Sequence, residues 1–310
     1  MKDSKKTILI ITGPTASGKS DIAIECAKKF NGEIISCDSM QIYKDLDIGT
    51  AKVTSEEQAL AIHHLINITT PDKEFSVQEY VSNAKQKIDD ICIRKKLPII
   101  VGGTGLYIKS LIYPYSFCSA PKNEKIREEY NNFLKKHGVD ALYELLKQKD
   151  YNASLKIHKN DTKRVIRALE ICDSTGNKKT DLNLNDKTEE LYNTIFIVLN
   201  FDREKLYEKI NYRVDKMFDL GLLEEFTNVI DKYNLDESHQ SMQAIGYKEL
   251  FDFVSNKATL EETKEKIKKN TRNYAKRQIT FMKGFKNAVW FNVLTDKNKI
   301  FDYISNNIKI

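Results

Sequence analysis

The eight residues from Gly13 to Ser20, GPTASGKS, constrain this chain more than any other stretch. They fit the phosphate-loop pattern GxxxxGK[ST] of ATP- and other nucleotide-binding proteins, and they lie between an apolar run and a helical pattern. The backbone N–H groups of such a loop form an anion cradle, a lysine adds positive charge, and a serine hydroxyl can hold Mg²⁺. The residues that we expect to bind phosphate are Gly13, Thr15, Ala16, Ser17, Gly18, Lys19 and Ser20, with Ser20 as the metal ligand.

The pattern of apolar runs predicts an α/β fold. The runs 7–12, 33–36 and 98–101 are each followed by a turn and a helical pattern, which is typical of a parallel sheet with crossover helices, and 194–199 reads as another buried strand. Between them, residues 121–185 are polar with helical spacing. We therefore expect a P-loop NTPase-like parallel sheet flanked by helices, built from residues 1–120 and 186–310, with an all-helical insertion domain at 121–185. Residues 175–187 are the expected mobile loop.

Composition and charge narrow the class of protein. The chain of 310 residues has no apolar stretch long enough for a signal peptide or a membrane span, which predicts a cytoplasmic location. Its five cysteines have no metal-ligand spacing, so we expect reduced thiols. The net charge is +6, and Lys264 to Lys286 contains nine basic residues against one acid. That segment is either a polyanion-binding surface or a solvated helix face.

An expected acidic residue is missing. A nucleotide hydrolase or kinase of this class normally carries a metal-binding carboxylate at the end of a buried strand, but the strand 98–101 ends in Gly-Gly-Thr-Gly. Asp38 is the only carboxylate at the end of an early strand. Because ligands bind at the carboxyl ends of parallel strands, the phosphate loop, Asp38 and Thr104 should meet in one crevice. Asp38 there would be either a metal ligand or a base facing a second substrate.

Seven motifs occur in a fixed order along the chain: GPTASGKS, DSMQIYKDLDIGTAK, HHLI, VGGTGLY, KRVIRALE, QAIGYKE and TRNYAKRQITF. Together, over residues 8 to 284, they resemble the tRNA dimethylallyltransferase family. Two positions depart from that family's pattern: Phe281 stands where tryptophan is usual, and Asn67 where aspartate is usual.

The resemblance implies that the phosphate loop holds the diphosphate of dimethylallyl diphosphate, with Mg²⁺, and that the acceptor is N6 of the adenine immediately 3′ of the anticodon in tRNA. It also implies catalytic roles for Asp38, Thr104 and Arg213. Asp38 would be the general base, with a metal-ligand role as the alternative. Arg213 would clamp the diphosphate, or else be a surface helix charge. Thr104 would hydrogen-bond near the reacting oxygen, or else only stabilise its turn.

The same resemblance implies a tRNA surface, since an adenine stacked in the anticodon loop must be extruded to react. Asp38 and Thr104 would also face the RNA, and Arg127 would contribute. The remaining expected tRNA contacts are Ser39, Met40, Gln41, Lys163, Arg164, Val165, Ile166, Arg167, Gln243, Ala244, Ile245, Gly246, Tyr247, Lys248, Lys276, Arg277, Gln278 and Lys283. We expect a monomer with no obligate protein partner and no membrane attachment.

Three other functions would also use parts of this sequence. A small-molecule kinase or ATPase would turn over ATP without RNA. An RNA-binding NTPase switch would use the basic segment but would not need Asp38. Prenyl transfer to free adenine nucleotides would leave the helical insertion and the basic segment without a polyanion to bind.

Overall fold

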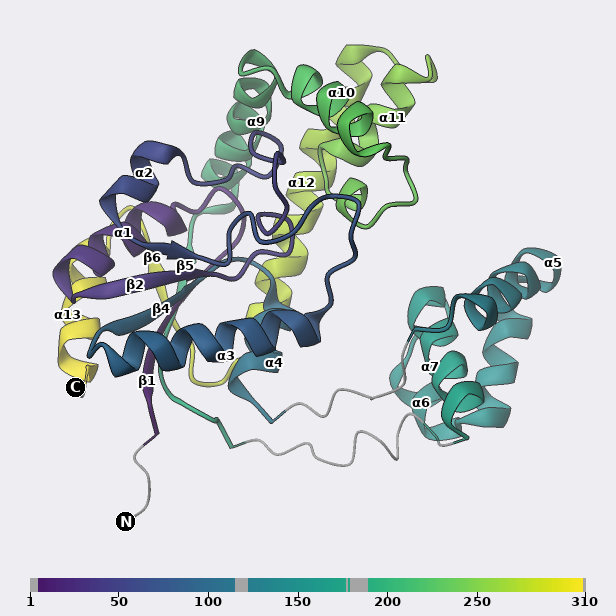
Figure 1. Ribbon diagram of the computed structural model, residues 1–310, viewed down its shortest axis with the longest axis horizontal. Helices are drawn as coiled ribbons and strands as arrows, with labels where there is room; N and C mark the ends of the chain where they lie inside the picture. Colours follow the sequence, from purple (N-terminus) through teal and green to yellow (C-terminus); the bar gives the residue numbers. More distant parts are fainter. Residues whose placement is uncertain (1–4, 115–121, 177, 179–188, 309–310) are drawn as a thin grey trace. The chain divides into compact units, whose positions relative to one another are not determined.

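The computed structural model describes residues 5–114, 122–176, 178 and 189–308 (Figure 1). The chain divides into two compact units, one made of residues 1–112 and 190–310 and the other of Tyr113–Glu189. Nearly all of the expected mobile loop 175–187, and Cys118, lie outside the described residues.

The first unit is built on a six-stranded, fully parallel sheet with strand order β3-β2-β4-β1-β5-β6. Its strands are β1 (Thr7–Thr12), β2 (Gly32–Ser36), β3 (His63–His64), β4 (Leu97–Val101), β5 (Asn193–Asn200) and β6 (Val289–Asn292). The four predicted strands are present, and β3 and β6 are additions at the two edges. The predicted fold class, a phosphate-loop-like parallel sheet flanked by helices with a helical insertion, is confirmed.

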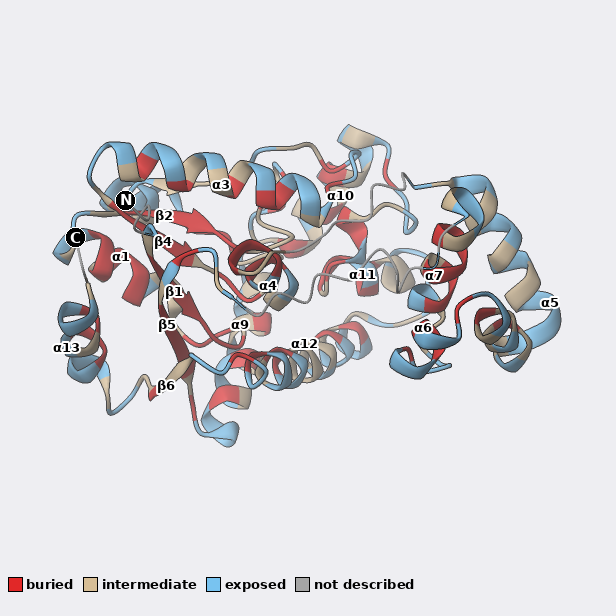
Figure 2. Ribbon diagram, turned by 90° about the horizontal axis from the view of Figure 1, so that it is seen from below, coloured by how far each residue is buried: buried red, intermediate tan, exposed pale blue. Residues whose placement is uncertain are grey.

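Helices cover both faces of the sheet (Figures 1 and 2). On one face, Leu9, Ile11 and Ile197 form a buried cluster with apolar side chains of α1 (Lys19–Lys29) and α13 (Lys297–Asn307). On the other, α3 (Val77–Ile93) packs on β2 and β4 beside α4 (Gly105–Ile112). Since both faces are buried, the central strands are apolar at nearly every position. This continuous apolar pattern is the reason that these strands could be predicted from the sequence.

Most of the remaining helices of this unit stand beyond the carboxyl ends of the strands (Figure 1). They are α9 (Arg203–Asp219), α10 (Leu222–Tyr233), the 3₁₀ helix η1 (Ser241–Gln243), α11 (Tyr247–Val254) and α12 (Leu260–Met282). The short helix α2 (Ser55–Leu60) lies beside α1 instead (Figure 1). The helix α12 contacts α9, α11 and α4. Within the described part of the chain, no helix combines the length and the apolar character that crossing a membrane requires.

The second unit is all helical. It contains α5 (Glu124–Lys149), α6 (Tyr151–Lys156) and α7 (Thr162–Thr175). Gly138 interrupts α5 with a φ of 82°, which L side chains rarely adopt. Leu142 and Leu146 of α5 pack on Val165 and Leu169 of α7 to form a small separate core.

A buried carboxylate supports one edge of the sheet. Glu33 on β2 is 1% exposed and accepts hydrogen bonds from Arg94, from Lys96 at 2.9 Å and from Nε2 of His64 at 2.8 Å. The Arg94 hydrogen bond is the main reason that the pKa of Glu33 lies far below its usual range. A carboxyl with a depressed folded-state pKa stabilises the protein above its unfolded pKa and loses that contribution as the pH falls.

We expect Glu33→Gln to lower the free energy of unfolding by about 1–3 kcal/mol at pH 7, because it removes the charged acceptor that the partly exposed Arg94, Lys96 and His64 share. Urea unfolding at pH 7 and at pH 4 measures this, and the deficit of the variant should shrink at the lower pH. The matched control is Asp89→Asn, which removes an exposed carboxylate paired with Lys6 and should change stability by less than about 1 kcal/mol. Equal, small effects of the two substitutions would contradict the role of Glu33.

Candidate active site

The phosphate-loop sequence joins β1 to α1, as predicted. Gly18 immediately precedes α1 with a φ of 75°, a left-handed conformation that suits glycine, and Ala16 adopts a φ of 64°. The helix begins at Lys19, so its unpaired N–H groups lie at the loop. The loop also lies against the end of β4, because the Thr12 hydroxyl donates a hydrogen bond to the carbonyl of Gly102 at 2.7 Å.

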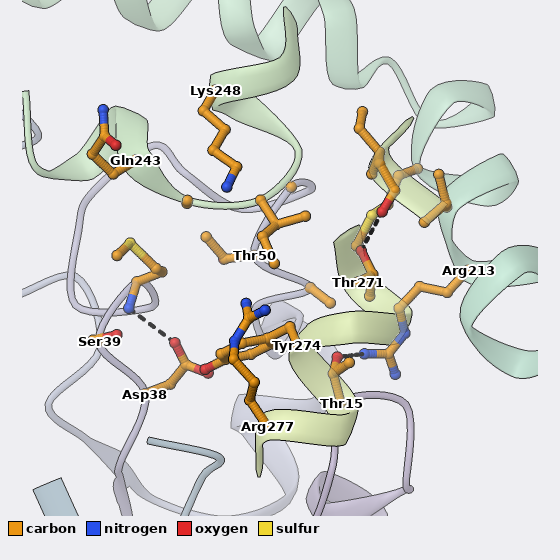
Figure 3. A pocket seen from close by; sticks show the side chains of 18 residues that line it. Thr15, Asp38, Ser39, Thr50, Arg213, Gln243, Lys248, Thr271, Tyr274 and Arg277 are labelled. Carbon is orange, nitrogen blue, oxygen red and sulfur yellow. Dashed lines mark hydrogen bonds between the residues drawn. The ribbon is translucent and has the colours of Figure 1, made fainter. Parts of the chain in front are cut away.

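Two cationic side chains converge on this loop from different elements. The Lys19 ammonium donates to the carbonyl of Pro14 at 2.7 Å, and Arg213 of α9 reaches the Thr15 hydroxyl at 3.5 Å (Figure 3). Burial, and then the nearby charge of Arg213, lower the pKa of Lys19 to about 7. Burial also lowers the pKa of Arg213. Two desolvated cations beside one loop favour binding of an anion there.

Asp38 and Thr104 lie next to each other at the ends of β2 and β4. Oδ1 of Asp38 accepts hydrogen bonds from the backbone N–H of Met40 at 2.9 Å and of Gln41 at 3.4 Å, which fixes the carboxylate. The Thr104 hydroxyl accepts from the N–H of Ser39 at 3.1 Å. The strand ends approach closely, since a side chain on Gly102 would place Cβ 2.0 Å from the carbonyl oxygen of Cys37.

Two adjoining pockets form over these strand ends. The first, of about 280 Å³, combines ten of the predicted site residues with Tyr274 and Thr271 of α12 (Figure 3); those ten are Thr15, Asp38, Ser39, Met40, Arg213, Gln243, Ala244, Ile245, Lys248 and Arg277. The second, of about 190 Å³, is formed by the phosphate loop, Gln41, Gly102 and Gln278. Six residues line both pockets: Thr15, Asp38, Thr50, Ala51, Arg213 and Tyr274. Asp38 therefore stands between an anion-binding loop and a larger open pocket.

The comparison with known proteins agrees with this geometry. A family model described as IPP transferase matches residues 41–285. A tRNA dimethylallyltransferase from Thermoanaerobacter sp. is 48% identical, covering 97% of this chain and 96% of the relative. One from Bacillus subtilis (strain 168) is 43% identical over 100% of both chains. The chain belongs to the IPP transferase family.

Solved structures of this family have the same fold. The full-length tRNA isopentenylpyrophosphate transferase from Bacillus halodurans matches with a TM-score of 0.71 and 39% identity, covering 98% of each chain. A eukaryotic dimethylallyltransferase acting on tRNA matches with a TM-score of 0.78 and 31% identity, covering 98% of this chain and 80% of that one. The family resemblance seen in the sequence is confirmed.

Sequence reasoning predicted Arg277 and Gln278 of α12 but missed Thr271 and Tyr274 of the same helix. Tyr274 lines both pockets, and burial together with the nearby Asp38 raises its pKa. Thr271, Tyr274 and Gln278 share one helix face, because they are spaced by three or four residues. That spacing inside the motif TRNYAKRQITF was the signal that could have identified Thr271 and Tyr274.

Six of the predicted tRNA contacts are buried: the small residues Ala244 and Gly246, and four residues with larger side chains. Val165 is 0% and Ile166 is 7% exposed, and both belong to the core of the helical unit. Tyr247 is 0% exposed and donates its hydroxyl proton to Glu225. Gln278 is 6% exposed. The family motifs include these four residues, but their side chains pack inside the protein, and this geometry does not support direct tRNA contacts by them.

Gln278 connects two loops that line the second pocket. Its Oε1 accepts a hydrogen bond from the N–H of Thr15 at 2.8 Å, and its Nε2 donates to the carbonyl of Gly103 at 3.1 Å. One buried amide therefore links the phosphate loop to the loop after β4.

Two of the three expected arginine contacts on the helical unit, Arg127 and Arg167, have a buried carboxylate as their partner. Glu170, which is 0% exposed, lies 2.9 Å from Nε of Arg127 and 2.8 Å from a terminal nitrogen of Arg167, and it accepts the N–H of Asn123. Burial raises the pKa of Glu170, but these hydrogen bonds outweigh it and lower the pKa overall. Lys163 and Arg164 are exposed on the same helix. For this unit, tRNA contact remains a prediction, best supported at those two residues.

A carboxylate on α10 holds the loop that forms one wall of the larger pocket. Glu225 accepts the backbone N–H groups of Asp47, Ile48 and Gly49 at 2.8, 2.7 and 3.0 Å, and the Tyr247 hydroxyl at 2.5 Å. Four hydrogen bonds to one carboxylate fix this loop in place. Gly49, Thr50 and Ala51 line the pocket directly behind it.

The two residues that depart from the family pattern, Asn67 and Phe281, both make specific contacts. Asn67 adopts a left-handed φ of 56° and accepts a hydrogen bond from the buried Lys52 at 2.6 Å, so it replaces a carboxylate oxygen with an amide oxygen. Phe281 covers the backbone of Gly105, where an added Cβ would lie 2.2 Å from the ring. Neither residue lines the two pockets described above.

The lowered pKa of Lys19 predicts pH-dependent anion binding. Methyl diphosphate, fully ionised above pH 7, should bind with proton uptake, because the bound anion stabilises the ammonium form. Its affinity should fall about tenfold for each pH unit above about 7. Calorimetry between pH 6.5 and 9, in two buffers of different ionisation enthalpy, measures the affinity and the uptake.

The matched control for this titration is Lys19→Arg, since arginine keeps its charge throughout this range. Its affinity for methyl diphosphate should vary much less with pH. Binding to the original protein without proton uptake near pH 8.5 would show that Lys19 is already charged before the anion arrives.

Proposed function

We propose that this chain transfers the dimethylallyl group from dimethylallyl diphosphate to N6 of the adenine immediately 3′ of the anticodon in tRNA, releasing diphosphate. The names of its relatives, at 43–48% identity over nearly the full chain, support the reaction class. The observation that carries the assignment is the place of Asp38 between the phosphate loop and a larger pocket. A phosphate-binding site with a fixed carboxylate beside an open cavity suits transfer between two substrates.

The diphosphate binds at the phosphate loop. The N–H groups at the start of α1, the ammonium of Lys19 and the guanidinium of Arg213 surround it with positive charge. As the allylic C–O bond breaks, its electron pair moves onto the diphosphate oxygen, and these groups stabilise that charge. The leaving group therefore departs as an anion that the site is already built to hold.

The adenine enters the larger pocket after it leaves the anticodon stack. The lone pair of N6 forms the new C–N bond, and one N6 proton becomes acidic as the bond forms. Asp38 accepts this proton. Oδ1 is oriented by the N–H groups of Met40 and Gln41, so the carboxylate does not need to reorganise during the step.

The residues around the loop fit a magnesium ion. The Ser20 hydroxyl lines the anion pocket together with the carboxylates of Asp21 and Asp38, and hard oxygen donors of this kind suit Mg²⁺ with a bound diphosphate. Ser20 would hold the ion, which neutralises charge on the leaving diphosphate when bound. The proposed tRNA substrate is consistent with the cytoplasmic location expected from the sequence, and the monomeric state stays a prediction.

Mass analysis of nucleosides tests the proposal. Unmodified tRNA incubated with the protein, Mg²⁺ and dimethylallyl diphosphate should yield adenosine heavier by one C₅H₈ unit, at the position 3′ of the anticodon. ATP should not replace the prenyl donor. ATP hydrolysis without prenyl transfer would overturn the assignment in favour of a kinase or ATPase.

The same assay tests Asp38 with Asp38→Asn, which keeps an oxygen to accept the Met40 N–H but removes the base. We expect kcat to fall about 10²- to 10⁴-fold while tRNA affinity stays within a few-fold. Ser39→Ala serves as the neighbouring control and should lose far less. If high Mg²⁺ restores the activity of Asp38→Asn, then Asp38 is a metal ligand rather than the base.

A further inference from the structure

A second groove lies on the side of α12 that faces away from the reaction pocket. It has a volume of about 720 Å³ and is formed by α9, α12 and β6. Lys276 and Lys283 line it, whereas Tyr274 and Arg277, on the opposite side of the helix, line the reaction pocket. Residues of the basic segment 264–286 therefore line two separate cavities.

The groove is strongly positive. Arg203, Lys276 and Lys283 line it, and none of its lining residues is acidic. Among the residues that the structure describes, no carboxylate oxygen lies within 4.0 Å of these three side-chain cations. Earlier in the same helix, Lys266 pairs with Asp252 at 2.6 Å and Lys268 with Asp215 at 2.8 Å. The three cations of the groove have no such carboxylate partner among the described residues.

The groove also presents aromatic rings among these charges. Arg203 stacks on Tyr207, with 5.4 Å from the guanidinium carbon to the ring centroid, and its Nε donates to the Tyr207 hydroxyl at 3.1 Å. The Lys276 ammonium lies 5.9 Å from the same centroid. Trp290 of β6 is half-buried on the lining. A single inorganic anion would use the cations but not the rings.

We propose that this groove binds an unpaired nucleotide of the tRNA substrate, with its base on Tyr207 and Trp290 and the adjoining phosphates on Arg203, Lys276 and Lys283. The inference rests on the proposed function, because it takes tRNA as the polyanion. Cations interleaved with partly exposed aromatic rings, such as Tyr207 and Trp290, are usual features of a single-stranded nucleic-acid site. The volume, more than twice that of the reaction pocket, is sufficient for a base with its sugar and phosphate.

Trp290 is the only tryptophan of the chain, so its fluorescence reports on this groove alone. An unmodified anticodon stem-loop RNA should quench it, with the same half-saturation as binding measured by anisotropy of the labelled RNA. Methyl diphosphate should not quench it. RNA binding without a change in Trp290 emission would overturn the proposal, and quenching by methyl diphosphate alone would assign the groove to a small anion.

Two sets of variants distinguish the contribution of base stacking to RNA binding from that of the groove's positive charge. Tyr207→Ala should weaken RNA binding between about fivefold and a hundredfold. The double variant Lys276→Ala with Lys283→Ala should lower the slope of log affinity against log salt by about two. The matched control is Lys205→Ala, an exposed lysine of α9 that pairs with Asp202 and does not line the groove; it should leave RNA affinity within twofold.

The two proposals fail in different ways. Prenyl transfer by the original protein, with RNA affinity unchanged in Tyr207→Ala and in the double lysine variant, would overturn the groove and leave the proposed function intact. Absence of prenyl transfer, with Trp290 still quenched by RNA, would overturn the proposed function and leave RNA binding at the groove.

Discussion

The buried amide of Gln278 is the interaction on which the active-site geometry depends. It accepts a hydrogen bond from the N–H of Thr15 and donates one to the carbonyl of Gly103. Thr15 follows β1 and Gly103 follows β4, so both lie far from α12 in the sequence. Loss of the side chain would leave two buried backbone groups unpaired, which typically destabilises a structure by about 1–3 kcal/mol for each group. The phosphate loop therefore keeps its position only when α12 is packed across the strand ends.

The other features of the site follow from this packing. With α12 in place, Tyr274 lies between Asp38 and the loop, and Arg277 faces the larger pocket. The opposite wall depends on Glu225, which holds the loop 47–49 by three backbone N–H groups. Both walls are fixed by buried or half-buried polar side chains that bond to backbone, and such contacts set a geometry more firmly than apolar packing alone.

The sequence predicted the central sheet and the phosphate loop because their signals are local. Continuous apolar runs marked β1, β2, β4 and β5, and the spacing of GPTASGKS marked the loop. The edge strands gave no comparable signal, since β3 has two residues and β6 has four. Asp38 was predicted from its place at the end of a strand and Arg213 from the family resemblance, and the structure brings both to the loop.

The partners of buried polar side chains could not be predicted in this way. Whether Arg167 faces RNA or Glu170, and whether Gln278 faces RNA or Thr15, depends on which elements pack against α7 and α12. A motif in one sequence identifies the residue but not its neighbours. The same limit applies to Lys276 and Arg277, which are adjacent in sequence but line different cavities.

The most direct measurement of the role of Gln278 is the binding of methyl diphosphate and of tRNA to Gln278→Ala. The control is Gln240→Ala, because the Gln240 amide likewise bonds to one backbone N–H and one backbone carbonyl, those of Phe75, and lines neither pocket. If Gln278 positions the phosphate loop, then Gln278→Ala should bind methyl diphosphate at least about tenfold more weakly, equivalent to roughly 1.4 kcal/mol, and keep its tRNA affinity within about threefold. Unchanged diphosphate affinity with weakened tRNA binding would contradict this role and would show that Gln278 contacts the RNA.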